Sequence, residues 1–281
     1  TAGTAPAAPL APDAPAGNVA GSTAPAHVPA GAANATPVNG GSVAGTAGNA
    51  APAGGDAAQS ATGAPGLSWP VVPPWPALAP VPAGSAAPVT PAPVPSGIIW
   101  IGTLNWHERT GGQQPEAIVY HVTDDLVFGN VRSHFTNLAS QASAHFVVGR
   151  EGELWQFVPT RHAAWTNGDY ANWRRDIPWL QEAIARCQRG ERNLNDFTCN
   201  IEFMGKPGLP FTPAQFDRAV EITRYLLDRY PRIQPHRGRM LRHADINGDT
   251  RPYCPGPTFP LRELILAVGG DPEGGVAGLR G

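Results

Sequence analysis

The 281-residue chain carries 20 lysine and arginine residues against 22 aspartate and glutamate residues, which gives a formal net charge of −2 at pH 7. This near balance excludes a strongly basic surface, so no nucleic-acid partner is expected. No run of about 18 apolar residues occurs, so the sequence predicts no membrane-spanning helix.

Residues 1–97 differ in composition from the remainder of the chain. Asp13 and Asp56 are their only acidic residues, and every lysine and arginine lies at Arg109 or later. A segment rich in alanine, proline and glycine cannot offset the entropy lost on ordering, and its prolines favour an extended chain. We therefore expect a long disordered tether over 1–97. Its tryptophan-containing stretch 67–81 is either an unordered apolar patch or a docking segment.

Strand and helix signals alternate along the balanced part of the chain, 98–281. Short β-branched or apolar runs predict strands, and apolar residues at helical spacing predict helices. The expected elements, in chain order, are a buried strand at 117–122, a short helix at 131–140, a hairpin at 144–159, a strand at 197–205, a long helix at 212–230 and a short helix at 260–269.

The helix at 212–230 has the clearest signals. Thr212 is the expected N-cap, Pro213 occupies the first helical position, and Gln215 completes a capping box. The predicted sheet-facing stripe consists of Phe216, Val220, Thr223, Leu227 and Tyr230. Together the elements predict an α/β fold: a single domain over 98–281 with a central mixed β-sheet flanked by helices, preceded by the disordered Ala/Pro/Gly-rich segment.

The loop at 242–259, RHADINGDTRPYCPGPTF, carries the strongest chemical signal. It holds His243 and Cys254 among turn-forming residues, although neither is needed to build a loop. Zinc prefers imidazole and thiolate ligands, and a hydrolytic site combines three protein ligands with a water. A third ligand should lie on a rigid, distant element, and His121 at the end of the first strand fits best. Other histidines remain as competitors on spacing alone: His107, His134, His145 and His162.

Three cysteines cannot all form disulfides with one another, so at least one is free or bound to something other than sulfur. A bond between Cys187 and Cys199 is one possibility in an oxidising compartment. A buried free thiol at Cys199 is the other, because free cysteine is commonly buried.

Six blocks in the order AIVYHVTDD, SAHFVVGREGELWQFVP, RHAAW, NDFTCNIEFMG, PFTPAQ and RHADI…CPGPTF span about 117–259. Together they resemble the zinc-dependent N-acetylmuramoyl-L-alanine amidases (type-2 amidases), a family that includes phage endolysins, muropeptide amidases and peptidoglycan recognition proteins. The resemblance implies that His121, His243 and Cys254 are zinc ligands.

Glu202 is the expected general base. Its position matches the acidic residue of the family's IGIE-like strand, and a carboxylate among apolar neighbours has its pKa raised toward the range of a useful base. The competing interpretation is a solvated glutamate on an edge strand. Some members of the family use a tyrosine just before the HF pair, where this chain has Ala144, so that role is not filled there.

The chain departs from the family at Pro252. The resemblance implies a lysine or histidine there that stabilises the oxyanion, and proline has no side-chain donor. Arg251 is the expected substitute, with Arg242 as another candidate. The block that contains His162 and Trp165 corresponds to residues that line the family's substrate groove, so both are candidate substrate-binding residues, although Trp165 could instead belong to the core.

The resemblance implies hydrolysis of the amide between N-acetylmuramic acid and L-alanine of the stem peptide, with peptidoglycan or muropeptides as partners and Zn²⁺ as cofactor. Two alternatives stay open: a binding module that recognises peptidoglycan without cutting it, and a zinc ion that only stabilises the fold. We expect a monomer. The tether favours a secreted cell-wall or periplasmic protein, or a phage-encoded lysin, over a cytosolic recycling enzyme.

Overall fold

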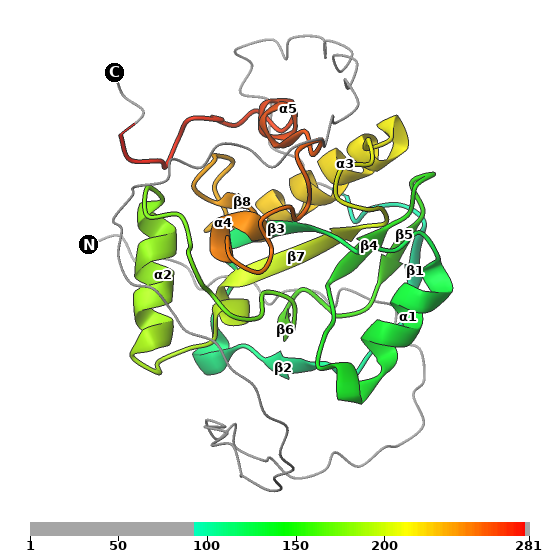
Figure 1. The fold of residues 1–281 in the computed structure, drawn as a ribbon, viewed down its shortest axis with the longest axis horizontal. Helices are drawn as coiled ribbons and strands as arrows, with labels where there is room; N and C mark the ends of the chain where they lie inside the picture. Colours follow the sequence, from blue (N-terminus) through cyan, green and yellow to red (C-terminus); the bar gives the residue numbers. More distant parts are fainter. Residues whose placement is uncertain (1–92, 279–281) are drawn as a thin grey trace, which may run out of the picture. The chain divides into compact units, whose positions relative to one another are not determined.

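The computed structural model describes residues 93–278 (Figure 1). A disordered tether was expected over 1–97, and residues 1–92 of that segment lie outside the described part of the chain. The first strand begins at Ile98. No helix within 93–278 has the length and apolar character needed to cross a bilayer.

A six-stranded sheet forms the centre of the fold, in the order β1-β5-β4-β7-β3-β8. Neighbouring strands are parallel except β4 and β5, which form the expected antiparallel hairpin, so the predicted mixed sheet is confirmed. A separate antiparallel pair joins β2 (Trp106–Glu108) to β6 (His162–Ala164). The six strands of the main sheet are β1 (Ile98–Trp100), β3 (Ala117–Val122), β4 (Phe146–Val148), β5 (Leu154–Gln156), β7 (Thr198–Phe203) and β8 (Met240–Arg242).

Strands β3 and β7 lie inside the sheet and supply most of the site. Both are six residues long and lie side by side in parallel, with His121 directly opposite Glu202. Every residue of β7 is buried, and β3 is buried except at Val122. Interior parallel strands are covered on both faces, which is why β3 is a nearly continuous apolar run, whereas the equally buried β7 alternates polar and apolar residues.

The long helix is α3 (Pro213–Arg229), and its predicted start is confirmed. The Thr212 side chain accepts a hydrogen bond from the Gln215 backbone N–H at 3.1 Å, and the Gln215 side chain accepts from the Thr212 N–H at 3.2 Å. The predicted sheet-facing stripe was partly wrong, because Val220 and Leu227 are only partly buried at the edge of the helix face that packs on the apolar cluster. The buried face also includes Ala219, Ile222 and Leu226.

The remaining helices cover the two faces and edges of the sheet (Figure 1). The helix predicted at 131–140 was misplaced: it begins three residues earlier and ends at Thr136, where Asn137 turns to extended backbone and caps a short 3-10 turn. The α2 helix was not predicted. The helical segments other than α3 are η1 (Thr110–Gly112), α1 (Phe128–Thr136), η2 (Leu138–Ser140), α2 (Pro178–Gln188), η3 (Leu194–Phe197), α4 (His243–Ile246) and α5 (Leu261–Ala267).

Apolar clusters lie on both faces of the sheet. On one face, Ile118, Tyr120, Ile201 and Phe203 pack with residues of α3 and α5. On the other face, Val119 of β3 packs with residues of α2, η3 and α4. Chain segments that are distant in sequence therefore meet on both sides of β3, and this positions the end of β3 near α4.

Candidate metal centre and catalytic groove

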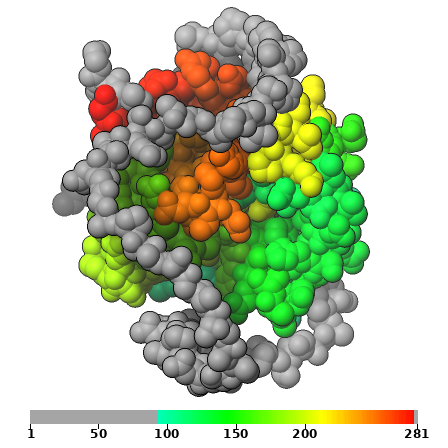
Figure 2. All heavy atoms as spheres, viewed as in Figure 1, coloured from blue at the N-terminus to red at the C-terminus, as the bar shows by residue number. Residues whose placement is uncertain are grey.

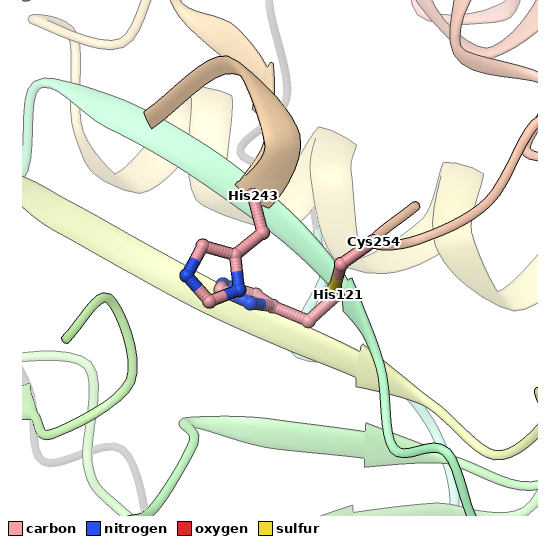
Figure 3. Close-up of side chains that lie close together, drawn as sticks. All are labelled: His121, His243 and Cys254. Atoms are coloured by element: carbon pink, nitrogen blue, oxygen red, sulfur yellow. The ribbon is translucent and has the colours of Figure 1, made fainter. Parts of the chain in front are cut away.

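The three predicted ligands converge in space. His121 is the second-to-last residue of β3, His243 begins α4, and Cys254 lies in the loop that follows α4 (Figure 3). One potential ligand atom from each residue lies within 4.8 Å of the other two. The two imidazole rings meet edge to face, with centroids 4.5 Å apart. Within residues 93–278, no other group of three histidine, cysteine or acidic side chains has this geometry.

Strand pairing and loop closure explain the convergence. β8 runs parallel to β3 with Tyr120 opposite Arg242. His121 and His243 each follow one of these paired residues along the chain, so they lie beside one another. The loop then returns: the Ala244 N–H donates to the carbonyl of Cys254 at 2.9 Å. The Val122 backbone N–H in turn donates to Cys254 Sγ at 3.4 Å.

Asp245 secures the start of α4. Its carboxylate accepts the Arg242 backbone N–H at 2.7 Å, and Arg237 Nη2 lies 2.8 Å from both of its oxygens. A buried carboxylate needs such partners to offset its desolvation. These bonds fix the turn from β8 into α4, from which His243 projects toward β3.

Burial sets the protonation of the three side chains. Desolvation lowers the pKa of His121, with the neighbouring His243 as the next cause, and lowers the pKa of His243 to about 4. Both rings are therefore neutral near pH 7, as metal ligation requires. Burial raises the pKa of the Cys254 thiol, so a cation that takes it as thiolate must displace a proton.

Glu202 lies on β7 next to these side chains. It is 8% exposed, and burial raises its pKa to about 8, although the positive charge of Arg251 partly offsets this effect. Its Oε2 has no hydrogen-bond partner among the described residues. The expected rise in the pKa of Glu202 is therefore confirmed, and the alternative of a solvated edge-strand glutamate is wrong, because β7 is an interior strand.

A cavity of about 750 Å³ opens over this cluster. Its lining includes Glu202, His243 and Cys254, together with Arg251 and Trp165. His121 lies beneath, 1% exposed. The loop after α4 (orange) reaches the surface beside the green surface that includes α1 (Figure 2). The cluster is thus buried at its base and accessible from one side, as a hydrolytic site requires.

The structure separates the two predicted substrate residues. Trp165 lines the cavity, and its indole Nε1 donates to His107 Nδ1 at 2.8 Å. His162 is not among the lining residues. Its ring stacks on Trp106 with centroids 4.1 Å apart, because β6 pairs with β2 at this point.

The two candidate arginines also differ. Arg251 is exposed and lines the cavity. Arg242 Nη2 lies 3.2 Å from the Asp245 carboxylate, so this guanidinium is engaged with α4. Pro252 also lines the cavity without offering a donor.

The competing histidines and cysteines have other environments. His145 is fully buried, its Nδ1 accepts the Asn200 N–H at 3.0 Å, and its Nε2 contacts the His162 carbonyl, so it is a packed, hydrogen-bonded histidine. None of the three cysteines forms a disulfide, so the possible bond between Cys187 and Cys199 is absent from the structure.

The residues that contact the two imidazoles were not predicted from the sequence. Asn200 Oδ1 lies 3.2 Å from His121 Nε2, and the backbone carbonyl of Asn167 lies 3.1 Å from His243 Nε2. A signal for Asn200 existed: in TCNIEF, polar and apolar residues alternate along a fully buried strand. No local pattern marks Asn167, because its contribution is a backbone atom.

Comparison with known proteins agrees with this geometry. Residues 111–257 match the model of the N-acetylmuramoyl-L-alanine amidase family, which is more than half of the 281-residue chain. The chain belongs to this family, and the resemblance drawn from the sequence is confirmed.

Among curated relatives, the 1,6-anhydro-N-acetylmuramyl-L-alanine amidase AmpD of Escherichia coli is 35% identical over 128 residues, which cover 46% of this chain and 59% of AmpD. AmpD of Haemophilus influenzae is 29% identical over 128 residues, with the same two coverages. The chain thus spans well under two thirds of the length of these relatives. A solved AmpD structure, a selenomethionine derivative, aligns with a TM-score of 0.49 and 24% identity over 62% of this chain and 95% of that one.

Proposed function

We propose that this chain is a zinc-dependent N-acetylmuramoyl-L-alanine amidase that hydrolyses the amide bond between N-acetylmuramic acid and L-alanine of the peptidoglycan stem peptide. The observation that carries the proposal is the convergence of His121, His243 and Cys254 beside Glu202 at the base of one cavity. Family membership and the AmpD relatives, whose name specifies this class of bond, support it.

The donor set fits zinc. Two neutral imidazoles and one thiol supply three ligands of the types that zinc prefers, and their separation of at most 4.8 Å between ligand atoms suits a single ion. His121, His243 and Cys254 would hold the ion. When bound at such a site, zinc lowers the pKa of a coordinated water to about 7 and polarises a carbonyl oxygen.

Glu202 performs the proton transfers in this proposal. A carboxylate with a pKa of about 8 exchanges protons readily near neutral pH. Its unpartnered Oε2 accepts a proton from the attacking water. The same carboxyl then donates that proton to the nitrogen of L-alanine as the amide bond breaks, so the base is regenerated.

Arg251 stabilises the negative charge that develops on the carbonyl oxygen. The position two residues before Cys254 is Pro252, which has no donor, whereas the exposed Arg251 guanidinium lines the cavity and acts electrostatically on Glu202. Trp165 contacts the glycopeptide from the cavity wall, and His162, which lies outside the lining, acts further along the substrate.

We also propose that residues 98–281 form the amidase domain, that 1–97 act as a tether, and that the protein works outside the cytoplasm on the cell wall or as a phage lysin. The charge-poor, Ala/Pro-rich composition of 1–97 supports a spacer. Fractionation of the source cells with an antibody against the chain tests the location, and a purely cytosolic signal contradicts it.

Digestion of purified peptidoglycan tests the proposed function. Zinc-loaded wild type should release new L-alanine amino termini, and Glu202→Gln, with zinc still bound, should release almost none. A recognition module without turnover is the competing function, which the missing donor at Pro252 favours. Wild type that binds peptidoglycan fragments but liberates no L-alanine termini, beside an active control amidase, would establish that alternative.

A further inference from the structure

Each of the two imidazoles has an oxygen acceptor within hydrogen-bond distance of its Nε2. His121 Nε2 lies 3.2 Å from Asn200 Oδ1, and His243 Nε2 lies 3.1 Å from the backbone carbonyl oxygen of Asn167. Asn167 and Asn200 are completely buried. Water does not compete for these contacts, so each governs the ring that it touches.

One hydroxyl joins the two supports. Thr198 Oγ1 accepts the Asn200 side-chain amide at 3.2 Å and the Asn167 side-chain amide at 2.8 Å. The Asn167 amide also donates to Asn195 Oδ1 at 2.8 Å, which anchors it to η3. We call Thr198, Asn200 and Asn167 the amide bracket. It lies behind both imidazoles and links the strand that carries Glu202 to the chain segment beside α4.

The bracket determines which ring nitrogen carries hydrogen. A backbone carbonyl can only accept, so His243 must donate from Nε2. The Asn200 amide group donates to Thr198, which turns its oxygen toward His121, so His121 also donates from Nε2. Each ring then keeps its lone pair on Nδ1, and this nitrogen is free to join the thiol of Cys254 as a ligand.

We infer that Asn200 is a positioning residue of the proposed zinc site. It holds His121 as the Nε2–H tautomer in one orientation, and Thr198 couples that ring to the support of His243 through Asn167. This inference rests on the proposed function, in which the two rings are zinc ligands. Partners of this kind behind a ligating histidine contribute about 10- to 100-fold to metal affinity.

The side chain of Asn200 can be tested apart from its backbone. The Asn200 N–H donates to His145 Nδ1 at 3.0 Å, and the His145 N–H donates to the Asn200 carbonyl at 3.2 Å. Both bonds survive a change of side chain. Asn200→Leu therefore removes the acceptor for His121 while β7 keeps these backbone contacts.

The first measurement is the zinc dissociation constant of the full chain, obtained by competition with a chromophoric chelator. We expect Asn200→Leu to weaken zinc binding about 10- to 100-fold. Asn200→Asp, which retains an acceptor, should recover most of the affinity, and Thr198→Val should show a smaller loss than Asn200→Leu. Equal dissociation constants for wild type, Asn200→Leu and Thr198→Val would overturn the inference.

Thr223→Val is the matched control. Thr223 is fully buried, and its hydroxyl lies 2.9 Å from the Tyr120 hydroxyl, on the face of β3 opposite His121. This variant should lower the melting temperature of the metal-free protein and leave zinc affinity unchanged. If it weakens zinc binding as much as Asn200→Leu, Asn200 has no role beyond general stability.

The second measurement needs no zinc. Imidazole ¹⁵N spectra of the metal-free wild type should show the proton of His121 and of His243 on Nε2, and Asn200→Leu should redistribute the His121 proton between its nitrogens. A wild-type His121 protonated on Nδ1 overturns the inference. Failure of wild type to bind zinc contradicts the proposed function instead, and the spectra still decide the role of Asn200.

Discussion

The two faces of strand β7 are equally buried and chemically opposite. Along Thr198–Phe203 every side chain is buried. On one face, Cys199, Ile201 and Phe203 join the apolar cluster that includes α3 and α5. The alternate residues Thr198, Asn200 and Glu202 point to the other face, where they meet the histidines and the cavity.

Burial alone therefore does not distinguish a stabilising apolar core from a functional polar surface. The apolar face stabilises the fold by removing hydrocarbon from water. The polar face opposes folding unless each group finds a partner, and Glu202 Oε2 has none among the described residues. A fold that retains such a group keeps it available for chemistry, so the two faces should respond differently to substitution.

The largest effect is expected on the polar side, at Cys254→Ala. Loss of one ligand should remove most bound zinc and reduce amidase turnover by roughly 10³-fold or more, because the metal contributes several kcal/mol to transition-state stabilisation. Zinc content by atomic absorption and L-alanine release from peptidoglycan measure this. Cys187→Ala, a free thiol on α2, is the control and should retain both. Full activity of zinc-free Cys254→Ala would contradict the proposed centre.

Glu202→Gln should separate chemistry from metal binding on the same face. We expect turnover to fall about 10²- to 10⁴-fold, the usual contribution of a general base, with zinc content unchanged. Steady-state kinetics on a soluble muropeptide provide the measurement. If zinc only stabilises the fold, this substitution leaves any activity intact, and that result would remove Glu202 from the mechanism.

Phe203→Ala, on the apolar face, should reduce the stability of the fold and leave zinc binding unchanged. Phe203 is completely buried against Tyr120, Phe211 and Phe259. Its truncation should lower the free energy of unfolding by about 3–5 kcal/mol through lost burial and a residual cavity. Urea unfolding measures the loss, and the folded variant should bind zinc as wild type does. A tenfold weaker zinc affinity in the folded variant would show that the two faces are not independent.

The smallest effect concerns pH. In the metal-free protein the pKa of Glu202 is about 8, against 4.5 as its ordinary value. Between these values the unfolded chain releases a proton that the folded protein keeps, so the free energy of unfolding falls as pH rises from about 4.5 to 8. Glu202→Gln should lack this component, which is on the order of 2–4 kcal/mol.

Urea unfolding in the presence of a chelator, at pH 5 and pH 8, makes the comparison. The free energy of unfolding of Glu202→Gln, relative to that of wild type, should be higher at pH 8 than at pH 5. Parallel pH profiles for the two proteins would show that burial does not hold the Glu202 proton in the folded state.

Elements with strong local signals could be predicted from the amino-acid sequence. The capping box of Thr212 and Gln215, the apolar run of β3 and the hairpin of β4 and β5 depend on neighbouring residues, so pattern and propensity locate them. The candidate ligands were also found, because His243 and Cys254 are chemically conspicuous in a loop of turn formers and because ordered motifs resemble an amidase family. The α2 helix was not among the elements predicted from the sequence, although its buried residues follow helical spacing: Leu180, Ala183 and Ile184.

Tertiary structure alone decided which side chains meet. The parallel register of β3 with β7 and β8 sets His121 opposite Glu202 and next to His243, and no local pattern encodes register between strands about 80 residues or more apart. The pairing of β6 with β2 separates His162, stacked on Trp106, from Trp165, which lines the cavity. The pairing of β3 with β7 also buries Asn200 behind an imidazole. Long-range pairing and burial create these contacts, so the positions of the supporting residues and the protonation of Glu202 follow from the folded chain.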